Sequence, residues 1–433
     1  MPNRFRTSLL SWALFLWLPG LVAFQSIPGT GALRTLFLLL GIVHIALLAS
    51  KASLPPWPQG RIELQLLALL TGWLVLQSAL VSPTPTASLT VLAKEWCKLV
   101  LVVGIGIVLT LLISRIDESG KRLGSALFIG FFIHVAATLL YQLILLVRIG
   151  KLDPGYSFIG NYGYVSPFVT GALALLMAES IERFRGGGWL PMKNSWLVVA
   201  IVAALVAQTV LNAKASLVVT FLMLILGAAL AGRAGLGQRW TMWFAVGLIF
   251  TMAGSVAMSN RWQGGLDAIQ VALRTPTTDF QTLEAPPLDP VPADAVHARG
   301  VWAKMALHGI AEHPFGLGYG GNAFGRYVVE QGGPGGAVSS HSGWLDFALA
   351  NGIPGLLLLL GLLWVVMRRG WMAFHAGNPA GMATLLLTFN YVARTAIDGN
   401  LYGSRLIGMA FVIAVLWTLA ARSIPPAHAA RPD

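Results

Sequence analysis

The chain has 433 residues, of which 56% are hydrophobic and only 11% are charged. Soluble globular domains carry roughly 25% charged residues, so this composition excludes a soluble enzyme, a disordered chain, a collagen and a disulfide scaffold. The net charge of +12 would suggest a nucleic-acid partner in a soluble protein. In a membrane protein, such an excess reflects Lys and Arg retained on the cytoplasmic side, and we expect no nucleic-acid partner.

Twelve apolar segments follow one another along the chain, each near the length of about 20 residues that a bilayer-spanning helix needs. They cover residues 8–24, 31–49, 62–81, 97–114, 123–147, 163–181, 195–210, 215–231, 240–258, 342–367, 381–397 and 405–421. A β-barrel would alternate with a period of two and have a much lower hydropathy, so the segments indicate helices. The predicted fold class is therefore an all-α polytopic membrane protein of about twelve transmembrane helices.

The first segment, and the connection between the seventh and eighth segments, differ from the rest of this series. Segment 8–24 lacks a small-residue cleavage site and is followed by further spans, so we expect an uncleaved first helix rather than a signal peptide. Segments 195–210 and 215–231 are separated by only four residues, which predicts a tight helical hairpin.

The basic residues of the loops predict that the N-terminus lies inside. With that orientation, the inside loops and the tail hold Lys51, Arg61, Arg115, Lys121, Arg122, Arg183, Arg185, Lys193, Arg233, Arg239, Arg368, Arg369 and Arg422. The long loop after span nine is set aside, because long loops translocate whatever their charge. Twelve spans then return the C-terminus to the inside.

The long loop covers residues 259–341, between nine spans in 1–258 and three spans with a tail in 342–433. It is polar, rich in Gly and Pro, and expected to face outward. Residues 264–274 and 298–313 look helical, and the second stretch has apolar residues at helical spacing before Pro314. A long loop with elements of its own is usually functional.

The sequence contains no motif of a metal or nucleotide site. None of the eight histidines form an HxxxH or HExxH pair, and His308 and His313 are five residues apart, on different helix faces. The Gly-rich stretch GLGYGG is not followed by the Lys-Ser/Thr of a phosphate-binding loop. We therefore expect neither a metal nor another cofactor.

Basic residues also gather near the predicted outer membrane boundary. They are Lys94, Lys98, Arg148, Lys151, Lys214, Arg261, Arg299, Lys304, Arg394 and Arg405. Cations near a membrane are costly unless they are paired or reach the headgroups, so these residues either bind an anion such as a pyrophosphate or snorkel to the surface. His341 lies at the junction of the loop and span ten, where an imidazole can take up a proton or serve packing alone.

The segment around residues 298–360 resembles the shared motif of the O-antigen ligase and polymerase superfamily. The matching residues are Arg299, Trp302, Pro314, Gly316, Gly318, Phe324, His341, Ser342, Leu345 and Gly352. Where the family has Ser-Arg-Gly at the start of a span, this chain has Ala213-Lys214-Ala215, which keeps a cation but loses the bidentate guanidinium. The segment YSFIGNYGYVSPF is also similar, less specifically, to the Asn-rich start of the family's span six.

This resemblance implies a GT-C-like glycosyltransferase in the bacterial inner membrane, with a long periplasmic loop between spans nine and ten. An O-antigen ligase moves a glycan from undecaprenyl diphosphate to the lipid A–core oligosaccharide on the periplasmic face. The donor, the acceptor and membrane lipids are the expected partners. Direct displacement would invert the anomeric centre, and side-chain cations would stand in for a metal ion.

The resemblance and the chemistry together suggest roles for individual residues. His341 is the expected base, and Arg299, Arg261 and Lys214 are the expected pyrophosphate ligands. Asp398 is expected either to pair with neighbouring arginines or to orient His341. Asp346 lies at about i+5 from His341 and is not expected to share its face.

Two other functions remain open from the sequence. An O-antigen polymerase would use the same donor and the same motif, but its acceptor would be another lipid-linked glycan. A polytopic transporter would be favoured by intramembrane charges and an inverted repeat. The charges within the spans are few and the loop holds most of the reactive residue types, which argues against the transporter. The motif is shared by ligase and polymerase and does not separate them.

Overall fold

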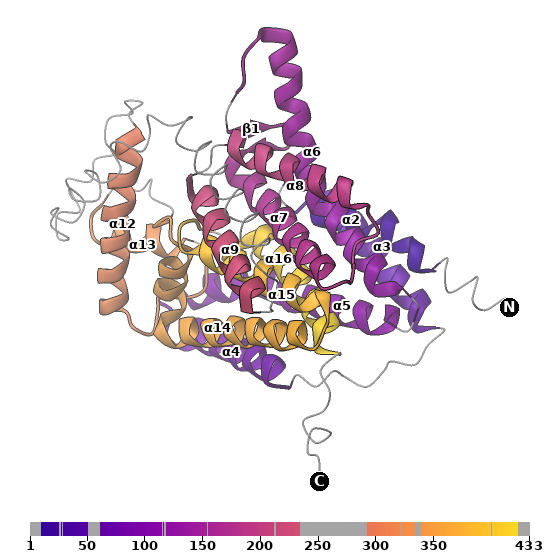
Figure 1. The fold of residues 1–433 in the computed structure, drawn as a ribbon. Helices are drawn as coiled ribbons and strands as arrows, with labels where there is room; N and C mark the ends of the chain where they lie inside the picture. Colours follow the sequence, from indigo (N-terminus) through magenta and orange to yellow (C-terminus); the bar gives the residue numbers. More distant parts are fainter. Residues whose placement is uncertain are drawn as a thin grey trace.

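The computed structural model describes residues 10–25, 27, 29–50, 61–114, 116, 118–153, 155–211, 214–233, 292–320, 322–333, 339–399 and 401–422. These residues form a mostly helical bundle (Figure 1). Its first half contains η1 (Ala13–Leu16), α2 (Leu18–Ala23), α3 (Gly31–Ala49), α4 (Arg61–Leu80), α5 (Pro85–Ile113), α6 (Ser119–Ile149), β1 (Tyr156–Ser157), β2 (Gly160–Asn161) and α7 (Tyr162–Phe184). The rest contains α8 (Asn194–Leu211), α9 (Lys214–Arg233), α12 (Pro292–Glu312), α13 (Ala323–Glu330), α14 (Gly343–His375), α15 (Pro379–Thr395) and α16 (Gly403–Ala421).

Within the described residues, seven helices are long and apolar enough to cross a membrane: α3, α4, α5, α6, α7, α8 and α14. Shorter apolar helices lie at Leu10–Ala23, Ser216–Gly232 and Arg405–Ala421. This pattern supports the predicted polytopic membrane protein. The predicted span 240–258 lies outside the described residues, so the count of twelve spans stays a prediction.

Most helix bounds agree with the hydropathy segments, and α3 matches its segment residue for residue. Two differences have clear causes. Helix α5 begins at Pro85, well before the predicted 97, because the polar residues of its first turns lower the hydropathy although Ser88, Leu92 and Trp96 form one buried face. The first segment is broken into η1 and α2 because Pro19 lacks an N–H group and is tolerated only in the first turn of a helix.

The predicted tight hairpin of α8 and α9 is wrong. Helix α8 packs mainly on α6 and α7, whereas α9 packs on α15 and α7, and the two helices have few contacts with each other. The two helices therefore share α7 as a neighbour but otherwise pack on different helices, α8 on α6 and α9 on α15.

Helix α15 occupies the middle of the bundle, between α14, α16, α7 and α9. Helix α14 lies against α15 and α4, and α4 and α14 run side by side along the lower edge of Figure 1. Helices α12 and α13 stand at the end where α14 begins. We call this the α12 end, and the end where α14 finishes the opposite end.

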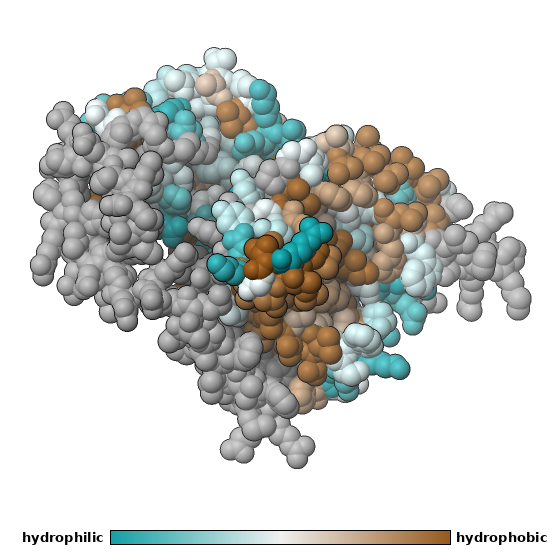
Figure 2. Space-filling view, turned by 90° about the horizontal axis from the view of Figure 1, so that it is seen from above, coloured by the Kyte–Doolittle hydropathy of each residue, from teal (hydrophilic) through white to brown (hydrophobic). Residues whose placement is uncertain are grey.

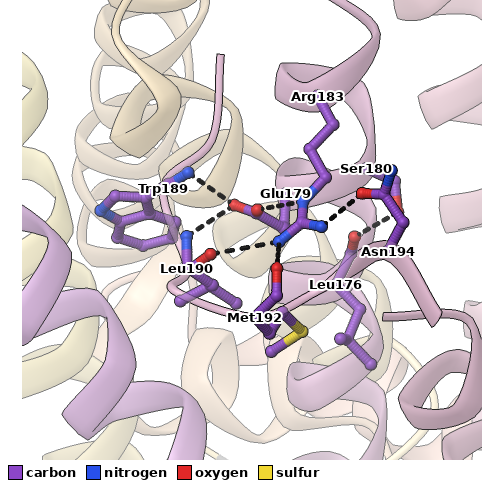
Figure 3. Close-up of polar contacts among 8 residues, drawn as sticks. All are labelled: Leu176, Glu179, Ser180, Arg183, Trp189, Leu190, Met192 and Asn194. Carbon is purple, nitrogen blue, oxygen red and sulfur yellow. Dashed lines mark hydrogen bonds and ion pairs between the residues drawn. The ribbon is translucent and has the colours of Figure 1, made fainter. Parts of the chain in front are cut away.

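The loop after α7 is fixed at the opposite end by a buried ion pair (Figure 3). The Glu179 carboxylate accepts hydrogen bonds from the backbone N–H groups of Trp189 and Leu190, both at 2.8 Å, and pairs with Arg183 Nε at 2.5 Å. Arg183 also donates to Asn194 Oδ1 at 2.6 Å and to two backbone carbonyls of the loop. We call this group the α7 clamp, and it joins the end of α7 to the start of α8.

The outer surface of the bundle is strongly apolar. Figure 2 shows broad areas of hydrophobic side chains on the face seen from above. Large exposed apolar residues include Leu143, Val147, Val198, Leu357 and Trp364. Such continuous apolar surface is typical of helices that face lipid.

Candidate functional site

The α12 end has a small apolar core of its own. Helices α12 and α13 pack on the first turns of α14 through residues that include Met305, Phe324, Tyr327 and Leu349. The predicted helix at 298–313 is confirmed and begins earlier, at Pro292. The predicted helix at 264–274 lies outside the described residues.

The Pro-x-Gly-x-Gly part of the motif, residues 314–318, fills a break in α14. At Gly352 the helix has a φ of 75° and a ψ of 170°, so the last carbonyls before the break lose their helical partners. Leu317 N–H donates to Leu349 O and Gly318 N–H to Ala350 O, at 2.9 and 2.8 Å. A side chain on Gly316, whose φ is 89°, would meet Ala350 O at 2.5 Å. This part of the motif is therefore architectural: it fixes the start of α14, and with it the segment that carries His341.

His341 is held in an uncommon conformation just before α14. Its φ of 59° lies in the left-handed region, which costs a residue with a Cβ of order 1–3 kcal/mol. Its ring stacks on Trp302 of α12, with centroids 5.2 Å apart and planes 15° apart. Its backbone N–H donates to Ser339 Oγ at 3.0 Å. The half-buried imidazole is thus fixed by both its backbone and its ring.

Asp346, which the sequence predicted not to share a helix face with His341, organises the same segment. Its buried carboxylate accepts from the Ser340 N–H at 2.9 Å and from Ser339 Oγ at 2.8 Å. His341 lies in the loop that precedes α14, so helical periodicity does not govern how these two residues meet. The charge of Asp346 also acts on the imidazole and raises its pKa.

Charged groups of α12, of α14 and of the loop after α15 act on His341. Burial is the main influence on its pKa and lowers it, and the positive charge of Arg299 on α12 lowers the pKa further. The negative charges of Asp398 and Asp346 oppose this shift. The net direction is downward, which favours the neutral form of the ring that can accept a proton.

Asp398 forms an ion pair with Arg394, one turn earlier at the end of α15, at 3.2 Å. This geometry agrees with one of its two predicted roles, and its charge reaches His341 as well. Arg394 is buried and also donates to Ser216 Oγ of α9, which shares a hydrogen bond of 2.6 Å with Ser166 of α7. The described contacts therefore connect the start of α9 to the surroundings of His341.

The other two predicted cations are Lys214 and Arg261, and the structure describes the side chain of neither. Lys214 is the first residue of α9, two residues before Ser216, and its side chain is outside the described part of the chain. Arg261 also lies outside the described residues. The structure therefore brings His341, Arg299 and Asp398 together, and it places the backbone of Lys214 near the same network.

The structure places two further cations at one pocket. Arg394 and Arg405 line one small pocket with Tyr391, and the Arg405 guanidinium lies over the Tyr164 ring, 4.6 Å from its centroid. The sequence placed both arginines near the outer boundary as neighbours of Asp398, but it gave no reason to expect a shared pocket. Their grouping depends on the packing of α7, α15 and α16, which hydropathy does not report.

The described residues contain no group of three or more His, Cys, Asp or Glu side chains that could hold a metal ion. They do contain a fixed imidazole whose pKa is influenced by one guanidinium and two carboxylates. Such an imidazole can take a proton from a hydroxyl, and guanidinium groups can bind phosphate oxygens in a bidentate way.

Comparison with protein-family models and with curated proteins found no match to this chain. Its function is therefore inferred from the residues and geometry of the site.

Proposed function

We propose that the protein is a glycosyltransferase that acts on a polyprenyl diphosphate donor, with the activity of an O-antigen ligase. The observation that best supports this proposal is the fixed position of His341 beside Arg299 and Asp398, at one end of a membrane-type bundle. In this proposal the α12 end faces the periplasm of a bacterial inner membrane. Undecaprenyl diphosphate carries the glycan, and the lipid A–core oligosaccharide receives it.

The proposed reaction is a single displacement. His341 takes the proton from an acceptor hydroxyl, whose oxygen forms a bond to the anomeric carbon of the donor sugar. The bond from that carbon to the diphosphate oxygen breaks on the opposite side, and the diphosphate leaves with the electron pair. The anomeric centre is inverted, and the proton stays on the imidazole until it passes to solvent.

The cations would stabilise the charge that grows on the leaving diphosphate. Arg299 is the first candidate, because its charge already acts on His341. Lys214 and Arg261 remain predicted ligands of the same group. The carboxylates of Asp346 and Asp398 would stabilise the imidazolium that forms when His341 takes the proton.

An O-antigen polymerase would use the same site with a different acceptor, and a transporter would leave the donor intact. A deletion strain separates the three. Loss of a ligase leaves undecaprenyl-linked polymer and bare lipid A–core, whereas loss of a polymerase leaves core with one repeat. Loss of a transporter leaves the donor on the cytoplasmic side. We expect the ligase pattern, and we expect complementation by the wild-type chain but not by His341→Ala.

A further inference from the structure

The carbonyl end of the first segment of α14, residues 343–351, is held by side chains of α4. The break at Gly352 leaves the last carbonyls of this segment without helical partners. Trp73 Nε1 donates to the carbonyl of Asn351 at 2.7 Å. Gln77 Nε2 donates to the preceding carbonyl at 3.0 Å. The two α4 residues are four positions apart and therefore share one helix face, which is turned toward α14.

These side-chain bonds complement the backbone bonds of the Pro-x-Gly-x-Gly segment. The N–H of Gly318 donates to the same carbonyl as Gln77, so that carbonyl has two donors. For the carbonyl of Asn351, the described contacts give the indole of Trp73 as the donor. The first segment of α14 is thus held on one side by the motif and on the other side by α4.

Gln77 is an uncommon residue for a membrane-type helix, because its amide is fully buried and only partly satisfied. Its Oε1 has no hydrogen-bond partner among the described residues. An unpaired buried acceptor is unfavourable, so an apolar side chain of similar size would be the more stable choice at this place. Stability therefore does not explain Gln77, whereas the N–H group that it offers to α14 does.

The same short segment of α14 also organises the loop of His341. Asp346 lies within it, and the Asp346 carboxylate accepts from Ser339 and Ser340, which precede His341. Residues 343–351 span only about 12 Å at the helical rise of 1.5 Å per residue. A shift at the carbonyl end is therefore transmitted to Asp346 and to the imidazole. A displacement of about 1 Å between reacting groups can slow a reaction about 100-fold.

We propose that Trp73 and Gln77 are positioning residues: by holding the carbonyl end of the first α14 segment, they set the place of Asp346 and of the His341 ring against Trp302. Both act through the backbone of α14 and not on a substrate. The effect on transfer rests on the proposed function, whereas the effect on the position of His341 does not.

The first experiment reports the position of His341 without requiring transfer. The full-length protein, in nanodiscs, is labelled with 5-fluorotryptophan, and the ¹⁹F signal of Trp302 is assigned by its loss in Trp302→Phe. Trp302 stacks on His341, so its signal responds when the imidazole moves. We expect the double variant of Trp73→Phe and Gln77→Met to displace this signal by at least half of the difference between wild type and His341→Ala. A signal that stays in place would overturn the inference.

Two control variants make the same chemical changes away from the break in α14. Trp189→Phe removes an indole N–H that donates to the backbone carbonyl of Gly120 at 3.0 Å, at the opposite end of the bundle. Gln208→Met replaces another fully buried amide, in α8. Both controls should leave the Trp302 signal in place. A displacement in either control as large as in the double variant would overturn the inference.

The second experiment measures transfer. The double variant should have a kcat at least tenfold lower than wild type and KM values within about twofold, because the substrates still bind but the reacting groups are misaligned. Gln77→Met alone should melt close to wild type, because the Gly318 N–H still satisfies the carbonyl. It replaces the double variant in both experiments if the double variant fails to fold. A raised KM with unchanged kcat, or the same fall in kcat in the two controls, would overturn the inference.

The outcomes for the positioning role and for the reaction are separable. A displaced Trp302 signal in the double variant, without any transfer by the wild type, would support the positioning role and contradict the proposed function. Transfer by the wild type, with the Trp302 signal and kcat unchanged in the double variant, would contradict the positioning role alone.

Discussion

The two ends of the bundle both contain an arginine paired with a carboxylate, but the surroundings of the two pairs differ. In the α7 clamp, Glu179 and Arg183 bind each other and the backbone of one short loop. At the α12 end, Arg394 pairs with Asp398 and also donates to Ser216 of α9, and the charge of Asp398 acts on a histidine in a strained conformation. The clamp uses its charges to hold a loop, whereas the α12 end concentrates charge beside a group that can exchange a proton.

This difference gives a physical criterion for separating a structural ion pair from a functional one. Removing a charge from the α7 clamp should reduce stability and leave the chemistry intact. Removing a charge near His341 should alter the chemistry and leave the fold largely intact. Variants at the two ends of the bundle test that criterion.

His341→Ala should reduce transfer by about 10²–10⁴-fold, the usual contribution of a general base. Insertion and melting temperature should stay close to those of the wild type. His341→Gly is the matched control, because glycine adopts a positive φ without strain and should melt at the same temperature or higher while being equally inactive. Transfer by either variant above a few per cent of wild type would exclude His341 as the base.

Glu179→Gln should destabilise the protein by about 3–5 kcal/mol, because it leaves Arg183 without its buried counter-charge. Thermal unfolding in detergent measures this effect, and the rate per folded molecule should not change. The matched control is Glu118→Gln, because Glu118 is 65% exposed in a loose ion pair with Arg122 and should have no measurable influence. Equal melting temperatures for the two variants would contradict the structural role assigned to the α7 clamp.

Arg299→Lys should slow transfer by roughly ten- to a hundredfold, the equivalent of a lost charge-assisted hydrogen bond of about 1.5–3 kcal/mol. An ammonium cannot hold two pyrophosphate oxygens in the geometry of a guanidinium. Lys214→Arg should be mild, because it supplies the residue that the resembling family has at this place. Turnover is compared at saturating and at low donor. If Arg299→Lys stays within about twofold of wild type in both conditions, Arg299 is a surface anchor.

The acid limb of the pH profile of kcat/KM should depend on the charges around His341. The base must be neutral, so kcat/KM should fall as the pH drops through the lowered pKa of His341. Asp398→Asn removes a charge that raises this pKa and should move the acid limb to lower pH. Arg299→Gln should move it to higher pH. A limb that stays in place in both variants would mean that another group controls the profile.

Excess EDTA should leave the rate of transfer unchanged, which is the smallest expected effect. The described residues offer no cluster of metal ligands at the α12 end, and arginines provide positive charge there. Turnover is measured before and after chelation and again with added magnesium. Loss of turnover that magnesium restores would require a metal site that the sequence did not predict.

Hydropathy predicted the helices because a membrane span is encoded locally, and α3 agrees with its segment at both ends. It failed at the start of α5, where polar residues such as Glu95 lie in a helix that the apolar segment did not include. The motif includes Arg299 and Trp302, which act on His341 or stack on it, but it does not include Asp346 or Asp398. The left-handed conformation of His341 depends on Asp346 and Trp302, and the bond from Arg394 to Ser216 joins residues far apart in the chain. Tertiary contacts of this kind leave no local pattern in one sequence.

The most direct test of the proposed function is transfer by the purified protein in liposomes that contain undecaprenyl diphosphate-linked glycan and lipid A–core. We predict that the glycan becomes linked to the core, that undecaprenyl diphosphate is released in equal amount, and that NMR shows an inverted anomeric centre. A product in which the glycan has joined another lipid-linked glycan would identify a polymerase. A donor that remains intact in the presence of wild-type protein and both acceptors would contradict the proposal.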